Sequence, residues 1–289
     1  MFNNLIIGAG QLGSRHLQGL LKFDKEQIIY VLDTSKSSLN IAEERASEIE
    51  FEHTIKYITN WDNIPSELDL VIVATGASVR SKVVTKLLKV CNVKNLILEK
   101  ILFQDLESYS DISKLIKATG TPTWVNHPRR MFKHYIDIKN KLSASEEVVN
   151  FQVFGGNWDL ACNALHFIDL ISFLSNSEVM ELDFKGIDNK VINSKRSNCI
   201  EFTGSFSGKL KNGNNFNICS GKKIPVKKLL KNIGMRLGVK PKTRNIAKQK
   251  GDMLETHGDN KKIKLFLKRK IRFTSLDEGL EETIYPNYD

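Results

Sequence analysis

The chain has 289 residues, of which 41% are hydrophobic and 26% charged, which is typical of a globular protein of about two domains. Its apolar runs are too short to cross a bilayer, and its four scattered cysteines form no CxxC pair, which argues against a membrane span, a zinc site and a disulfide framework. No paired metal ligands or export signal stand out, so we expect a cytoplasmic protein with no metal site.

The net charge of +10 is concentrated near the C-terminus, where residues 221–272 hold 18 Lys or Arg against three acids. Such a region can attract nucleic acid, an anionic membrane surface or a phosphorylated substrate. It can equally be a solvated face, and the basic–apolar alternation of Ile263–Phe273 is typical of a half-exposed strand. No nucleic-acid-reading motif accompanies the charge, so we expect no specific nucleic-acid partner.

Short apolar strands alternate with helical stretches over the first 120 residues, which predicts a parallel sheet covered by helices. The strands expected here are Leu5–Ile7, Ile28–Leu32, Leu70–Ala74 and Leu96–Leu98, and the helices are Ser14–Phe23, Leu39–Glu50 and Val79–Val90. We therefore predict a doubly wound Rossmann domain over residues 1–122.

A glycine-rich motif joins the first strand to the first helix and consists of Gly8, Ala9, Gly10, Gln11, Leu12 and Gly13. Gly8 permits the tight turn, Gly10 lets a pyrophosphate approach, and Gly13 lets helix and strand pack closely. The free N–H groups of the helix N-terminus then face the phosphates. The motif predicts a dinucleotide-binding loop.

Asp33 ends the second strand, about 20 residues beyond the glycines, where a carboxylate can bind a ribose diol. It would repel a 2′-phosphate, which favours NAD, while nearby Lys36 leaves NADP open. Glu99 and Lys100 follow the strand Leu96–Leu98, at the edge where open α/β sheets bind ligands. A lysine beside a nicotinamide can polarise or protonate a substrate oxygen.

The second half predicts a different architecture, a helix packed on strands, over residues 123–289. Val148–Phe154, Ile200–Leu210 and Asn214–Cys219 are expected to be strands, with a turn at 211–213, and Ala161–Leu174 has apolar residues at helical spacing.

Five segments, in this order, resemble the glucose-fructose oxidoreductase / inositol dehydrogenase / rhizopine catabolism family. They are the glycine motif continuing to His16, Asp69–Thr75, Leu98–Lys100, Asn126–Phe132 and His166–Asp169. The resemblance implies an α/β protein with an N-terminal Rossmann domain, followed by an α+β domain with an open, mostly antiparallel sheet. It also implies that Lys100 and His166 act together on a sugar hydroxyl or carbonyl group.

Further residues are candidates for the two sites, and the chain departs from the family at two places. Thr75 and Glu99 are assigned to the cofactor site, and Asp169 is a candidate substrate contact. Trp158 can stack on a sugar ring or belong to the core, and Arg129 can hold a substrate phosphate or carboxylate or form a surface ion pair. Many family members carry an aspartate four residues before the histidine, where this chain has Cys162 beside Asn163, which can substitute for that aspartate. Relatives usually continue with a helical segment that a chain ending at Asp289 would lack.

The sequence therefore predicts an NAD(P)-dependent oxidoreductase for a saccharide or nucleotide-sugar, with a role in surface-glycan synthesis by analogy. The alternative is a dinucleotide-binding sensor or scaffold that lost activity together with the aspartate. A homo-oligomer is expected by analogy alone, because sheet faces in this family are often dimer interfaces.

Overall fold

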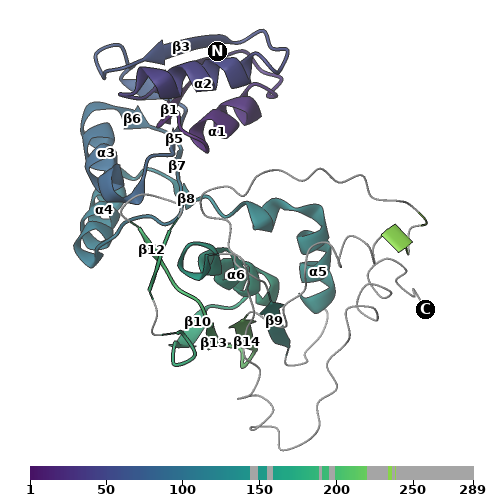
Figure 1. Ribbon diagram of the computed structural model, residues 1–289. Helices are drawn as coiled ribbons and strands as arrows, with labels where there is room; N and C mark the ends of the chain where they lie inside the picture. The colour runs from purple at the N-terminus through teal and green to yellow at the C-terminus, as the bar shows by residue number, and fades with distance from the viewer. Residues whose placement is uncertain are drawn as a thin grey trace, which may run out of the picture. The chain divides into compact units, whose positions relative to one another are not determined.

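The computed structural model describes residues 1–143, 149–154, 159–188, 191–194, 199–219, 234, 235 and 238. The chain divides into two compact units, Met1–Pro128 and Arg129–Asp289 (Figure 1). The strand expected at Ile263–Phe273 lies outside the described residues. Within the described part, no helix is both long and apolar enough to span a membrane.

The first unit is built on a six-stranded sheet with the order β3-β2-β1-β5-β7-β8, in which every paired strand is parallel to its neighbour. Its strands are β1 (Phe2–Ile7), β2 (Gln27–Leu32), β3 (Thr54–Ile58), β5 (Leu70–Val73), β7 (Leu96–Leu98) and β8 (Thr123–Val125), and a separate parallel pair joins β4 (Glu67–Leu68) to β6 (Asn92–Val93). The helices are α1 (Gly13–Leu20), α2 (Lys36–Ala46), α3 (Ala77–Val90) and α4 (Leu106–Thr119). This order confirms the predicted doubly wound Rossmann fold.

The sheet is buried on both faces, because successive strand residues point in opposite directions. Leu5 and Ile7 pack with residues of α3 and α4, whereas Ile6, between them, packs with Leu17 of α1 and Ala42 of α2. Side chains on both faces are almost wholly removed from solvent. The uninterrupted apolar strands of the sequence are the consequence of this two-sided burial.

Local hydrogen bonds set the helix ends and shift some predicted boundaries. The helix expected from Leu39 begins at Lys36, because the Ser35 hydroxyl accepts a hydrogen bond from the Ser38 N–H and caps the helix there. The strand β8 pairs with β7, which keeps residues up to Pro128 in the first unit.

The second unit contains a four-stranded sheet with the order β10-β13-β14-β9, in which two pairings are antiparallel and β14–β9 is parallel. Its elements are a 3₁₀ turn at Pro128–Met131, α5 (Lys133–Ser143), β9 (Asn150–Phe154), α6 (Leu160–Ser175), β10 (Val179–Asp183), β11 (Ile192–Asn193), β12 (Ile200–Glu201), β13 (Ser205–Leu210) and β14 (Asn215–Cys219). This mostly antiparallel sheet beside helices confirms the predicted fold class. Ile171 of α6 packs on Phe206 and Leu210 of β13 to form the core.

One predicted strand is wrong. Ile200–Leu210 is not continuous: β12 pairs with β11, while β13 pairs with β10 and β14. The interruption spans residues 202–204. Gly204 has a φ of +102°, which is disfavoured for other residues, and a Cβ there would lie 2.4 Å from the Gly186 carbonyl oxygen. The turn expected after Leu210 is confirmed, with Gly213 at a φ of +86°.

Candidate functional site

The glycine loop of the first unit is fixed by backbone contacts that exclude side chains. Gly8 has a φ of +98°, and a Cβ built on Gly13 would lie 1.7 Å from the Gly8 carbonyl oxygen. A Cβ built on Gly10, in contrast, meets nothing within 4 Å. The first and third glycines are therefore required by the fold, whereas the second leaves an open backbone surface that a phosphate group can approach.

The loop lies where the strand order of the sheet reverses. After β1, the Gly8 N–H donates to the Leu32 carbonyl at 2.8 Å, and after β5 the Ala74 N–H donates to the Ile7 carbonyl at 2.8 Å. A Cβ on Gly8 would lie 3.0 Å from the Thr75 nitrogen, so Thr75 borders the loop. Ligands of open parallel sheets bind at this reversal, outside the carboxyl ends of the strands.

Asp33 joins the glycine loop to the turn before α2. One carboxylate oxygen accepts a hydrogen bond from the Ala9 N–H at 2.7 Å, and the other accepts from the Ser35 N–H at 2.8 Å. The carboxylate thus stands beside the loop at the end of β2, where the sequence predicts it. Its placement fits a dinucleotide ribose next to the phosphate-binding turn.

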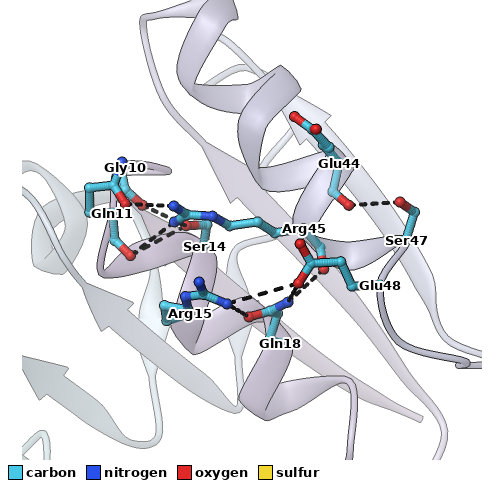
Figure 2. Close-up of polar contacts among 9 residues, drawn as sticks. All are labelled: Gly10, Gln11, Ser14, Arg15, Gln18, Glu44, Arg45, Ser47 and Glu48. Carbon is cyan, nitrogen blue, oxygen red and sulfur yellow. Dashed lines mark hydrogen bonds and ion pairs between the residues drawn. The ribbon is translucent and has the colours of Figure 1, made fainter. Parts of the chain in front are cut away.

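The first turn of α1 is held by contacts from α2, which sequence reasoning did not identify (Figure 2). Arg45 donates to the side-chain oxygen of Gln11 at 2.6 Å and to the hydroxyl of Ser14 at 2.6 Å. Leu12, which also belongs to the motif, is 42% exposed to solvent.

Glu99, directly after β7, is a buried carboxylate that connects three parts of the first unit. Its Oε1 lies 2.7 Å from His16 Nε2 of α1 and accepts a hydrogen bond from Asn126 Nδ2 at 2.6 Å. Burial alone would raise the pKa of Glu99, but the hydrogen bonds from His16 and Asn126 and the electrostatic interactions with His16 and Arg80 outweigh it and lower that pKa. The carboxylate is therefore held ionised inside the domain.

Lys100, the next residue, is half-buried and is followed by a cis peptide bond to Ile101. Arg80 of α3, which is 2% exposed, supports this turn by donating to the carbonyls of Glu99 at 2.7 Å and Leu102 at 2.9 Å, and also to that of Ile101. Another guanidinium nitrogen of Arg80 donates to the Thr75 carbonyl. Arg80 thereby ties the segment that carries Lys100 to the end of β5, a role without a signal in the sequence.

In the second unit, the candidate residues Asn163, His166 and Asp169 all lie on α6. Asn163 donates from Nδ2 to the Asp159 carbonyl at 3.4 Å. Asp169 accepts two hydrogen bonds from Arg130, at 2.7 and 2.6 Å, and forms an ion pair with it.

The other two predicted substrate contacts differ in what the structure describes. The guanidinium of Arg129 lies 4.4 Å from the ring centroid of Phe167, so it stacks on an aromatic face of α6. Trp158 lies outside the described residues.

Sequence reasoning also missed Glu201, a carboxylate that is 3% exposed on β12. It accepts hydrogen bonds from the backbone N–H groups of Ala161 at 2.8 Å and Cys162 at 3.3 Å. These groups belong to the first turn of α6, where a carboxylate satisfies free donors and complements the helix dipole. The signal in the sequence was a lone acid between Ile200 and Phe202.

The structure therefore gathers the predicted cofactor residues of the glycine motif around one turn, with Asp33 and Thr75 beside it. The described residues contain no cluster of three or more His, Cys, Asp or Glu side chains able to hold a metal ion. The open Gly10 face, the helix N-terminus and the Asp33 carboxylate together fit a dinucleotide.

Comparison with protein-family models agrees with this geometry. Residues 2–127 match the model described as "Oxidoreductase family, NAD-binding Rossmann fold", the glucose-fructose oxidoreductase / inositol dehydrogenase / rhizopine catabolism family. Residues 2–127 are thus similar to the NAD-binding Rossmann domain of this oxidoreductase family. The resemblance predicted from the sequence is thereby confirmed, and the match supports NAD(H) as the dinucleotide without distinguishing it from NADP(H).

Solved structures extend the similarity of fold into the second unit. Myo-inositol 2-dehydrogenase from Lactobacillus plantarum is 16% identical, with a TM-score of 0.55 over 75% of this chain and 68% of that one. Myo-inositol dehydrogenase from Lactobacillus casei, in complex with NAD(H) and myo-inositol, is 18% identical, with a TM-score of 0.56 over 75% and 66%.

The fold is also similar to that of a protein described as a repressor. A super-repressor mutant of Gal80p from Saccharomyces cerevisiae is 17% identical, with a TM-score of 0.60 over 78% of this chain and 69% of that one. Comparison with curated protein sequences finds no significant match.

Proposed function

We propose that this chain is an NAD-dependent oxidoreductase that transfers a hydride between nicotinamide and a hydroxyl or carbonyl group of a sugar, polyol or nucleotide-sugar. The observation that carries the proposal is the glycine loop, in which Gly13 packs against the Gly8 carbonyl and leaves the Gly10 backbone open. Asp33 beside that loop favours NAD over NADP, because its charge would repel a 2′-phosphate.

Lys100 and His166 are proposed as the catalytic residues. The dinucleotide, when bound, supplies the hydride acceptor or donor. In oxidation, the Lys100 ammonium would donate a hydrogen bond to the substrate oxygen and make its hydroxyl more acidic, and His166 would accept the proton. In reduction, His166 would return that proton to the same oxygen. Asn163, one helical turn before His166, would orient the imidazole.

Substrate binding is assigned to Arg129, Trp158 and Asp169. Glu99 is proposed to support the cofactor site through its contacts with His16 and Asn126. Both carboxylate oxygens of Asp169 already accept hydrogen bonds from Arg130, so Asp169 would contact a saccharide together with that guanidinium. We place the reaction in surface-glycan synthesis, in the cytoplasm, with the chain acting as a homo-oligomer.

The first test is titration of the purified protein with NADH and NADPH, followed by nicotinamide fluorescence. We expect micromolar binding with NADH preferred, and then turnover with inositols, sugars or nucleotide-sugars. Absence of binding by both dinucleotides would contradict the proposal.

The catalytic roles are tested by Lys100→Met and His166→Ala, each expected to lower kcat by at least about 100-fold with NADH affinity nearly unchanged. Lys94→Met is the matched control for Lys100, because Lys94 lies before β7 and pairs with Asp69. His134→Ala, an exposed residue of α5, is the control for His166. Full turnover in either catalytic variant would rule out the role assigned to that residue.

A second candidate function is a dinucleotide-binding sensor or scaffold without turnover. Two observations favour it: Cys162 in the first turn of α6, and the similarity of fold to the Gal80p super-repressor mutant. A sensor would bind NADH tightly but show no change in nicotinamide absorbance with any sugar offered.

A further inference from the structure

The side chain of Arg45 reaches from the last turn of α2 to the first turn of α1 (Figure 2). One guanidinium nitrogen donates to the Ser14 hydroxyl at 2.6 Å and to the Gln11 carbonyl at 3.3 Å, and the other donates to Gln11 Oε1 at 2.6 Å. In return, Gln18 of α1 donates to the Arg45 carbonyl at 2.7 Å. Arg45 thus binds the main chain and a side chain of the glycine loop at once.

These contacts satisfy a carbonyl that the helix itself leaves open. In a regular α-helix the Arg15 N–H would donate to the Gln11 carbonyl, but here it donates to Leu12 at 3.0 Å. The N-cap residue of α1 is Leu12, whose apolar side chain cannot accept a hydrogen bond from the first turn. Arg45 and the Ser14 hydroxyl, at 3.3 and 3.4 Å from the Gln11 carbonyl oxygen, take over this function.

The second consequence concerns the position of the Gln11 side chain. Because Arg45 holds its amide oxygen, that side chain is drawn toward α2, and the backbone of Gly10 stays open. Ser14 reinforces the same turn, since its hydroxyl donates to the Gly10 carbonyl at 2.9 Å. The phosphate-facing turn is therefore shaped before any ligand arrives.

The third consequence is electrostatic. Arg45 is half-buried, and among the described residues no carboxylate lies within 4.0 Å of its guanidinium. Glu48, one turn from it, is instead directed to Arg15 and Gln18. The positive charge of Arg45 adds to the partial positive charge at the N-terminus of α1.

We propose that Arg45 is a positioning residue for the diphosphate of the dinucleotide, acting through Gln11 and Ser14 and through its charge. The inference rests on the proposed dinucleotide binding. It adds to the glycine motif a residue on a different helix, which sets the shape and the anion affinity of the loop. Lysine cannot replace it fully, because an ammonium lacks the planar fork that holds two partners.

The test compares the NADH dissociation constants of the wild type, Arg45→Ala, Arg45→Lys and Arg15→Ala at low and moderate salt. Arg15 is the matched control, since it belongs to the same network but contacts Gln18 and Glu48 rather than the loop. We expect Arg45→Ala to weaken binding about ten-fold at low salt and less at moderate salt. Arg45→Lys should be intermediate, and Arg15→Ala should stay within about two-fold of the wild type.

Several outcomes would overturn the inference. Equal binding by Arg45→Ala and wild type would show that the loop does not depend on Arg45, and an equal loss in Arg15→Ala would assign the effect to general loosening of α1 against α2. If Arg45→Ala does not fold, Arg45→Lys and Ser14→Ala provide the same comparison, and wild-type affinity in both would overturn it. Failure of the wild type to bind either dinucleotide would instead refute the proposed function, and the inference with it.

Discussion

The first unit builds its candidate site from main chain, whereas the second presents its candidate residues as side chains on one helix. Backbone atoms lie close to the Cβ positions of Gly8 and Gly13, so steric contact alone fixes the conformation of the loop once the sheet has formed. The helix α6, by contrast, depends on polar contacts from elsewhere in the chain, from Glu201 at its N-terminus and Arg130 at Asp169. The comparison teaches that steric fixation tolerates almost no substitution, while fixation by side chains can be loosened in steps.

The largest expected effect comes from breaking the steric side of this comparison with Gly13→Ala. A Cβ on residue 13 would lie 1.7 Å from the Gly8 carbonyl oxygen, so the start of α1 has to move away from the end of β1. We therefore expect the free energy of unfolding to fall by about 3 kcal/mol and NADH binding to be lost. Denaturant unfolding and fluorescence titration measure the two effects.

The control is Gly10→Ala, where the Cβ has open space. We expect its stability to change by less than about 1 kcal/mol relative to the wild type, while NADH affinity still falls because the pyrophosphate approach is obstructed. If both variants unfolded equally easily, the loop would not be fixed as described.

A smaller effect is expected from removing the carboxylate that holds α6. Glu201→Ala leaves the Ala161 and Cys162 N–H groups of a buried helix end without this acceptor, which should cost about 2 kcal/mol. Glu201→Gln, which keeps an acceptor oxygen, should lose about half as much, and both are measured by denaturant unfolding. Glu178→Gln, at an exposed pair with Lys211, is the control and should change stability by less than about 0.5 kcal/mol. Equal stability of Glu201→Ala and wild type would show that α6 does not need this cap.

The smallest effect is a change in the pH dependence of the first unit. Because the pKa of Glu99 is lower in the folded state than its ordinary value of 4.5, its contribution to stability is present above that pH. It is lost as the pH falls through the lower folded-state value. Glu99→Gln should therefore flatten the acid side of the stability curve, as measured by urea unfolding at a series of pH values. An unchanged acid slope in this variant would contradict the ionised, hydrogen-bonded carboxylate.

Features that depend on neighbouring residues in the chain were predictable from sequence. The Rossmann domain followed from the alternation of strands and helices, and the glycine loop from the spacing of Gly8, Gly10 and Gly13, because both are local patterns. The mostly antiparallel sheet of the second unit came partly from the family resemblance.

Features that depend on contacts distant in sequence were not predictable. Arg45 meets Gln11, Arg80 meets Glu99, and Glu201 meets α6 only after folding, and each is an ordinary charged residue in the sequence. The interruption at residues 202–204 was missed for a similar reason, since the close approach of Gly204 to Gly186 is set by tertiary structure. The roles of Lys100 and His166 stay predictions.

The arrangement around Glu99 bears on how the first unit opens. The ionised carboxylate of Glu99, directly after β7, contacts His16 of α1 and Asn126 after β8. If any of these three segments detached, the buried charge of Glu99 would lose a hydrogen-bond partner. Local opening of α1 alone is therefore costly, and the three segments are coupled into one cooperative unit. The glycine helix thus shares its opening free energy with the strand end that carries Lys100, through this carboxylate as well as through the apolar cluster that contains Leu17 and Ile97.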